Sequence, residues 1–125
     1  MYCLDTDFLA AVLRAEPEAL RFAEGLEARN EELGTTPVTI AELFKGAALF
    51  GDEEKAEAVE GLLNNLDLLG FDAHAAKLAG TLLAAAKKKG LPLGDFDTVI
   101  GAIALRHEAT LVTRNLKHFG RIPNL

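Results

Sequence analysis

Three acidic residues stand where their side chains can act together. Asp5 follows the short apolar run 2–4, while Glu42 and Asp97 each lie near the start of a predicted helix. In an open α/β sheet, such positions converge on the crevice outside the carboxyl ends of the strands. Carboxylates gathered there repel one another unless protons or a cation intervene. Because Mg²⁺ prefers oxygen ligands, the pattern predicts a metal-dependent enzyme.

Each acid also has a structural explanation. Thr39-x-x-Glu42 has the form of a capping box, in which Glu42 only bonds the backbone at the start of a helix. Asp95 is a good N-cap, and Asp97 would interact favourably with the dipole of the same helix. Any residue of 5–7 can cap the first helix. The joint pattern favours a shared site, because helix caps need not face one crevice.

Other polar groups extend the set, and several kinds of chemistry are excluded. Thr6, Thr113 and Asn115 lie at or after predicted strand ends, where they would orient a phosphate or a water, although ordinary turn chemistry explains them too. His107 and His118 have no metal-binding spacing to each other, and we expect both at the surface. The sequence contains no serine, its one cysteine lacks a matched histidine, and no glycine-rich phosphate loop is present.

The hydrophobic periodicity predicts an α/β fold. The expected strands are 2–4, 33–38, 67–71 and 110–113, with Ile122 in a short fifth, and the expected helices are 8–13, 17–32, 39–50, 53–66, 73–89 and 95–107. Alternating strands and helices imply βαβ crossovers and a mostly parallel sheet covered on both faces. We therefore expect a three-layer α/β/α sandwich whose core holds most of the phenylalanines.

Length and composition fit one globular domain over residues 1–125. The chain is 50% hydrophobic and 26% charged, and no apolar stretch is long enough to span a membrane. No signal peptide is evident, so we expect no membrane association. Cys3 is the only cysteine, which excludes an intrachain disulfide and points to a reducing cytoplasm. We expect it to be buried in the first strand.

The charge is unevenly distributed. A formal net charge of −6 argues against binding nucleic acid over the whole surface. From residue 106 onward, however, the sequence contains only one acid, Glu108, but four basic residues, namely Arg106, Arg114, Lys117 and Arg121. A basic segment beside an acidic metal site would suit a phosphodiester substrate, and a solvated charged surface explains the same residues about as well.

Four segments, in order along the chain, resemble the PIN-domain ribonucleases, and within them the VapC toxins of prokaryotic toxin–antitoxin systems. They are Leu4-Asp5-Thr6-Asp7-Phe8-Leu9, Thr39-Ile40-Ala41-Glu42-Leu43-Phe44-Lys45-Gly46-Ala47, Phe96-Asp97-Thr98-Val99-Ile100-Gly101-Ala102 and Leu111-Val112-Thr113-Arg114-Asn115. The chain differs from the usual motifs at Asp7, where Asn is common, and at His118, where Asp is common.

The resemblance implies a Rossmann-like fold and Mg²⁺- or Mn²⁺-dependent endoribonuclease activity. It also implies a homodimer and a cognate VapB-type antitoxin, usually one with a DNA-binding half. Asp5, Glu42 and Asp97 correspond to the metal-binding acids of the family. Asn115 occupies the position of a fourth acid in the family. Asp95 would support Asp97 without itself contacting the metal.

The expected mechanism is hydrolysis of an RNA phosphodiester by a metal-activated water. Asp5, Glu42 and Asp97 would hold one Mg²⁺, or two when substrate oxygens complete the coordination. Thr6, Thr113 and Arg114 would position the substrate. The alternatives are a non-catalytic PIN-like module that binds RNA or protein, and a phosphoacceptor domain with Asp72 as its acceptor.

Overall fold

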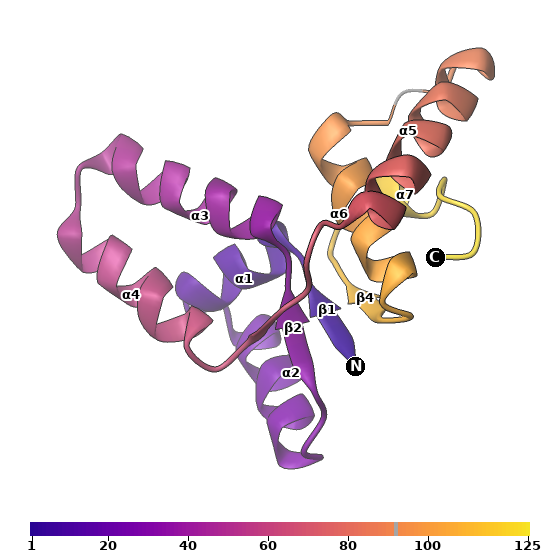
Figure 1. The fold of residues 1–125 in the computed structure, drawn as a ribbon. Helices are drawn as coiled ribbons and strands as arrows, with labels where there is room; N and C mark the ends of the chain where they lie inside the picture. The colour runs from indigo at the N-terminus through magenta and orange to yellow at the C-terminus, as the bar shows by residue number, and fades with distance from the viewer. Residues whose placement is uncertain (92) are drawn as a thin grey trace.

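A four-stranded parallel sheet forms the centre of the computed structural model, which describes residues 1–91 and 93–125 (Figure 1). Its strands are β1 (Tyr2–Leu4), β2 (Leu33–Thr35), β3 (Asp67–Leu68) and β4 (Thr110–Val112). They lie in the order β3-β2-β1-β4, and all three pairings are parallel. The carboxyl ends of the strands therefore meet at one edge of the sheet, as the sequence predicts.

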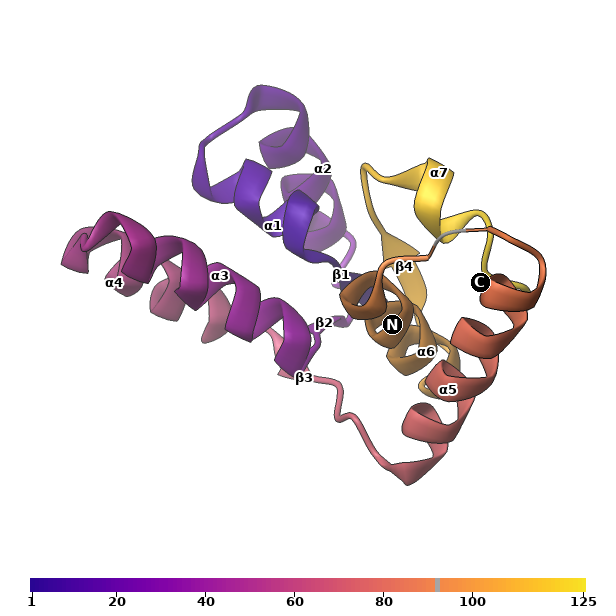
Figure 2. The same cartoon turned by 90° about the horizontal axis from the view of Figure 1, so that it is seen from above.

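Helices cover both faces of the sheet. They are α1 (Thr6–Leu13), α2 (Pro17–Ala28), α3 (Pro37–Phe50), α4 (Glu53–Leu63), α5 (Ala73–Lys88), α6 (Asp95–Arg106) and α7 (Leu116–Phe119). Figure 2 shows α1 to α4 on one side of the strands and α5 with α6 on the other. Leu4 packs in a core with helices α1 to α4, whereas Cys3 packs with α5 and α6. This alternation along β1 confirms the predicted three-layer arrangement and the burial of Cys3.

The second strand is shorter than predicted. The expected strand 33–38 ends at Thr35, because Thr36 caps α3 and Pro37 occupies its first turn. The Thr36 hydroxyl accepts a hydrogen bond from the Thr39 N–H at 3.1 Å, which is the geometry of an N-cap. The helix therefore begins before Thr39, and the predicted start at that residue is wrong.

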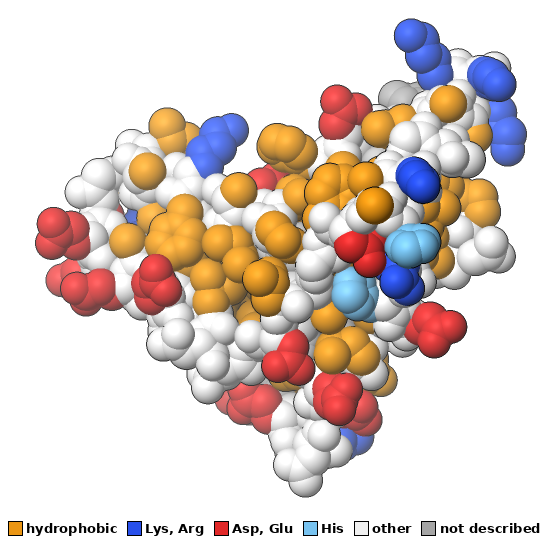
Figure 3. Space-filling model, viewed as in Figure 1, with side chains coloured by type: hydrophobic (Ala, Val, Ile, Leu, Met, Phe, Trp, Pro, Cys, Tyr) orange, Lys and Arg blue, Asp and Glu red, His pale blue; other side chains and the backbone are white. Residues whose placement is uncertain are grey.

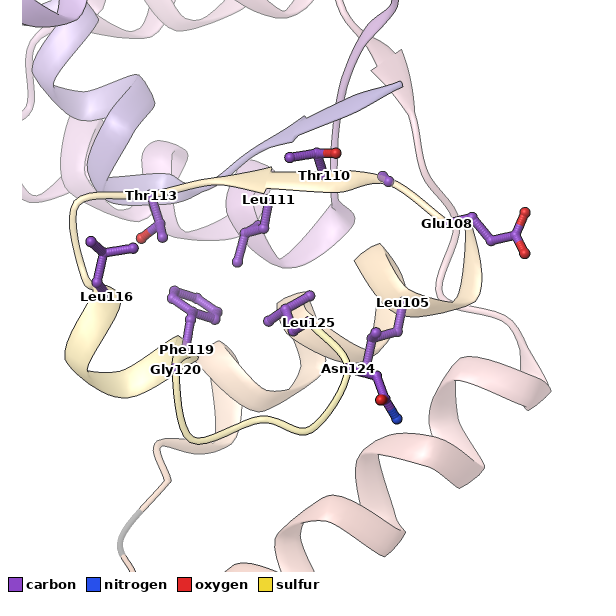
Figure 4. Close-up of a pocket in the computed structure, with 11 residues that line it drawn as sticks. Leu105, Glu108, Thr110, Leu111, Thr113, Leu116, Phe119, Gly120, Asn124 and Leu125 are labelled. Carbon is purple, nitrogen blue, oxygen red and sulfur yellow. The ribbon is translucent and has the colours of Figure 1, made fainter.

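The C-terminal segment also differs from the prediction. Ile122 does not join a fifth strand; it is buried against α6, where a Cβ on Gly101 would lie only 2.6 Å from its Cδ1 atom. Helix α7, which the periodicity did not predict, precedes it. Figure 4 shows Leu111 of β4 facing Phe119 of α7, so this short helix packs directly beside β4. The residues that α7 carries are thereby fixed relative to the sheet.

The surface carries both apolar and charged groups. Phe22, Phe50, Phe71 and Phe96 are exposed, so the expectation that most phenylalanines are core residues is wrong. Figure 3 shows basic side chains gathered over the free end of α5 and acidic ones over α4 and α2. Within the described part of the chain, none of the helices has the length and apolar character needed to cross a membrane.

Candidate active site

Polar residues follow three neighbouring strands directly. Asp5 follows β1, Thr36 follows β2 and Thr113 follows β4. The register pairs Leu4 with Val112, and the Asp5 N–H donates to the Val112 carbonyl at 3.1 Å. The sheet therefore brings Asp5 and Thr113 side by side at its carboxyl edge, where ligands bind in open α/β sheets.

Asp5 is the most deeply buried of the three acids, with 3% of its surface exposed. Its Oδ1 atom caps α1 by accepting the Phe8 N–H at 2.8 Å. Burial raises the pKa of Asp5 to about 6, helped by the negative charges of Asp7 and Asp97 and opposed by hydrogen bonds from Thr113 and Phe8. A nearby positive charge would stabilise the ionised form of a carboxylate in this environment.

Glu42 points toward the residue that follows Asp5. The Thr6 hydroxyl donates to Glu42 Oε1 at 2.6 Å, and Thr6 Oγ1 also lies 3.3 Å from Thr39 Oγ1. Because Thr36 caps the helix, Glu42 lies in the second turn of α3 and not in the predicted capping box. The capping-box explanation for Glu42 is thus removed. Its contact with Thr6 instead links α3 to the start of α1.

Asp97 lies in the first turn of α6 and contacts α7. Asn115 Nδ2 donates to Asp97 Oδ2 at 3.4 Å, and His118 Nδ1 lies 3.7 Å from the same oxygen. Burial raises the pKa of Asp97, the His118 ring lowers it, and the charge of Asp7 raises it. The Asn115 N–H in turn bonds the Thr113 hydroxyl at 2.9 Å.

The structure separates other predicted residues from the three acids. Arg114 forms an ion pair of 3.0 Å with Glu16 at the start of α2. Asp95 is exposed at the first position of α6, whose cap is Gly94, so the predicted N-cap at Asp95 is wrong. Asp72 caps α5 and pairs with Arg106 at 3.2 Å beyond an edge strand of the sheet. This placement does not support the phosphoacceptor alternative.

His118 was missed as a site residue. We expected it at the surface, yet its Nδ1 atom is buried and faces Asp97. A four-residue helix has too few positions to show a hydrophobic period, so α7 could not be predicted from periodicity. The available signal was the motif itself, since His118 occupies a position where the resembled family commonly has an acid.

The donor chemistry of the site fits a hard divalent cation. The charge of Asp97 raises the pKa of Asp5, and the charge of Asp7 raises the pKa of both, so a cation there would relieve the repulsion. All three predicted ligands offer carboxylate oxygens, as Mg²⁺ requires. In residues 1–91 and 93–125, no group of three or more His, Cys, Asp or Glu side chains is already arranged to hold an ion. Cation binding would therefore require the carboxylates to turn toward one another, and the Thr6 bond to Glu42 Oε1 leaves Oε2 for the ion.

Two concavities flank β4 on opposite sides. One, of about 740 Å³, lies between β4 and the start of α2; the other, of about 570 Å³, lies between β4 and the C-terminal segment. Thr113 lines both, but none of Asp5, Glu42 and Asp97 does. The acids are thus beside these spaces and not inside them.

Comparison with known proteins extends over the whole chain. A family model described as the PIN domain matches residues 2–125. "Ribonuclease VapC2" from Rickettsia felis is 31% identical over 126 residues, covering 100% of this chain and 94% of the relative. The "tRNA(fMet)-specific endonuclease VapC" from Salmonella typhimurium is 30% identical over 125 residues, covering 99% and 93%. The crystal structure of VapBC2 from Rickettsia felis bound to a promoter DNA fragment matches with a TM-score of 0.90 and 30% identity, over 99% of this chain and 94% of that one.

Proposed function

The chain belongs to the PIN-domain family, and we propose that it is a divalent-cation-dependent endoribonuclease, the toxin of a toxin–antitoxin pair. The observation that carries the proposal is the buried carboxylate of Asp5, whose pKa is raised to about 6 beside Asp7 and Asp97. Perturbed carboxylates of this kind cluster at functional sites. The names of the full-length relatives, which are ribonucleases and an endonuclease, support the same activity.

Asp5, Glu42 and Asp97 would hold Mg²⁺ or Mn²⁺. When bound, such a cation would supply a Lewis acid for the phosphate and would lower the pKa of a water molecule. The role of the chain is to orient the three carboxylates. Thr6 holds Glu42 Oε1, and Asn115 holds Asp97 Oδ2.

The substrate we propose is RNA. Phe96 stands directly beside Asp97 in sequence and is 59% exposed, so it offers a face on which a base can stack. Lys117 is exposed on α7 next to the site and offers a charge for a phosphate. Arg114 is a weaker candidate for contacting the substrate, because its guanidinium already forms an ion pair with Glu16.

The partners we propose are a VapB-type antitoxin and a second copy of this chain, acting in the cytoplasm. The matched Rickettsia felis and Salmonella typhimurium structures are described as DNA-bound VapBC complexes. Exposed apolar side chains at the end of α3 and on β3 support a protein partner, since Leu49, Phe50 and Leu68 are all more than half exposed. The single buried Cys3 suits a reducing compartment.

The proposal is tested by incubating the purified protein with structured RNAs, including initiator tRNA, in Mg²⁺, Mn²⁺ or EDTA. We expect cleavage that requires the cation and is lost in Asp5→Asn and Glu42→Gln. Asp52→Asn is the matched control, because Asp52 also caps a helix, α4, but is not one of the three predicted ligands. Cleavage that persists in EDTA, or in both site variants, would refute the proposal.

The structural contacts that Asp5 and Glu42 already make favour a second candidate, a PIN-like module that binds RNA or protein without cutting. In that case Asp5 is only a helix cap and Glu42 only a partner for Thr6. The same assay separates the two. A folded protein, free of antitoxin, that binds RNA but neither cleaves it nor binds Mn²⁺ would establish the binding module.

A further inference from the structure

One nitrogen atom near the site lacks a partner. Among the described residues, His118 Nδ1 is the buried side-chain nitrogen or oxygen that makes no hydrogen bond. Unsatisfied buried polar atoms are uncommon and require an explanation. About a third of the His118 side chain is exposed, but its Nδ1 atom is buried and must be satisfied by a group of the protein.

The group that Nδ1 faces is Asp97. The two side chains approach to 3.7 Å between Nδ1 and Oδ2, which is too long for a hydrogen bond but needs only a small movement to become one. Asn115 Nδ2 donates to the same Oδ2 atom at 3.4 Å. Both nitrogen contacts thus fall on one oxygen of Asp97, so that Oδ1 is the oxygen left to face a cation.

The position of His118 is fixed by its neighbour. Phe119 is 4% exposed and packs with Ile100 and Ala102 of α6, the helix that carries Asp97. Gly101 allows the segment after α7 to pack closely on the same helix, because a Cβ there would lie only 2.6 Å from Ile122 Cδ1. The imidazole and the carboxylate therefore sit on elements that are packed rigidly together.

The negative charge near Asp97 favours a hydrogen-bond donor beside its carboxylate. Asp7 raises the pKa of Asp97, whereas His118 lowers it, so the two act on Asp97 in opposite directions. The His118 nitrogen thus faces a carboxylate that also experiences the negative charge of Asp7.

We propose that His118 is a positioning residue for Asp97: when a divalent cation binds, Nδ1–H donates to Asp97 Oδ2 and fixes Oδ1 as the metal-facing oxygen. The proposal rests on the proposed metal site. Groups that orient a metal ligand in this way affect metal affinity strongly. Hydrogen bonds at such sites are often long before the ligand binds and shorten afterwards.

The test is Mn²⁺ binding by the full chain, measured from the electron paramagnetic resonance signal of free Mn²⁺. We expect His118→Ala to bind Mn²⁺ about 10- to 100-fold more weakly than the native protein. His118→Asn should recover most of the affinity, because its amide nitrogen can occupy the place of Nδ1. His118→Gln should not, because its amide reaches toward the place of Nε2. His74→Ala, at an exposed site in the first turn of α5, is the control and should bind like the native protein.

The outcomes separate this inference from the proposed function. Native protein that binds Mn²⁺ while His118→Ala binds equally well would overturn the role of His118 and leave the metal site standing. Equal weakening in the Asn and Gln variants would also overturn it, because the position of the donor would then be irrelevant. Native protein that binds no Mn²⁺ would overturn the proposed function, and this inference with it. Thermal unfolding of each variant identifies any loss of affinity that comes from misfolding.

Discussion

Replacing Asp5 with Asn is expected to stabilise the folded protein at neutral pH. The Asp5 carboxyl is 3% exposed, and burial is the largest cause of its raised pKa. At pH 7 the folded protein must therefore keep a charge where it is poorly solvated. Asn removes that charge, and it preserves the cap on α1 because Asn and Asp are equally good at an N-cap. The Phe8 N–H retains an oxygen acceptor.

The sign and size of the effect follow from the pKa. The folded-state pKa of about 6 lies above the ordinary value of 3.8, so the folded protein binds this proton more tightly than the unfolded chain does. The resulting stability is fully present below about pH 4 and is lost as the pH rises through about 6. At about 1.36 kcal/mol per pKa unit, the loss is about 3 kcal/mol. This is a large share of the 5 to 15 kcal/mol that is typical of a domain.

The measurement is urea unfolding of native protein and Asp5→Asn in EDTA, at several pH values from 4 to 8. We expect the free energy of unfolding of Asp5→Asn, relative to native, to rise by about 3 kcal/mol between pH 4 and pH 8. Asp52→Asn should show the native pH dependence. A difference that is constant with pH, or a variant less stable than native at pH 8, would refute the reasoning.

Cation binding should remove most of this difference in stability. A ligand that binds only the folded state at 100 times its dissociation constant stabilises that state by about 2.7 kcal/mol. Native protein in Mn²⁺ should therefore regain most of the stability that ionised Asp5 removes, whereas Asp5→Asn should gain little. Equal stabilisation of both proteins would show that Mn²⁺ binds elsewhere.

Four further substitutions address other parts of the structure. Glu42→Gln should abolish cleavage but change the free energy of unfolding by less than about 0.5 kcal/mol, whereas Thr36→Ala should cost about 1 kcal/mol or more because Thr36 is the helix cap. A destabilised Glu42→Gln would show that the charge of Glu42 supports the fold through its contact with Thr6. Phe96→Ala should weaken RNA binding by about 1 to 3 kcal/mol in a filter-binding assay without altering thermal unfolding, and unchanged binding would exclude stacking. Gly101→Ala should lower stability by about 1 to 3 kcal/mol, because the new Cβ would meet Ile122 at 2.6 Å, and native-like unfolding would show that the C-terminal segment can move away.

The sheet and the acids nearest to it were predictable from sequence. Short apolar runs ending in Asp5 and Thr113 belong to parallel strands, and the carboxyl ends of parallel strands must share an edge. The long helices carry clear periodicity and obvious ends, such as Asp52 and Asp72 at the caps of α4 and α5 and Gly90 in the left-handed conformation after α5. These features depend only on local sequence.

The environment of Glu42 was not predictable from local sequence. Two threonines, Thr36 and Thr39, each satisfy the pattern of an N-cap, and both precede a helix-compatible run. Thr36 is the N-cap because Pro37 suits the first turn of a helix, where its missing N–H costs nothing. That shift of three residues removes Glu42 from the first turn and frees its side chain to meet Thr6. A sequence motif alone cannot resolve such competition between adjacent caps.

Structural and functional explanations of these acids are compatible, because each carboxylate has two oxygens. Asp5 caps α1 through Oδ1, Glu42 accepts from Thr6 through Oε1, and Asp97 accepts from Asn115 through Oδ2. A carboxylate offers about four lone-pair positions, so each contact leaves capacity for a cation. The structural contact restricts the rotation of the side chain and thereby lowers the entropy lost when an ion binds. A residue placed as a helix cap at the carboxyl end of a parallel strand is thus already partly oriented as a ligand, and evidence for the cap is no evidence against the site.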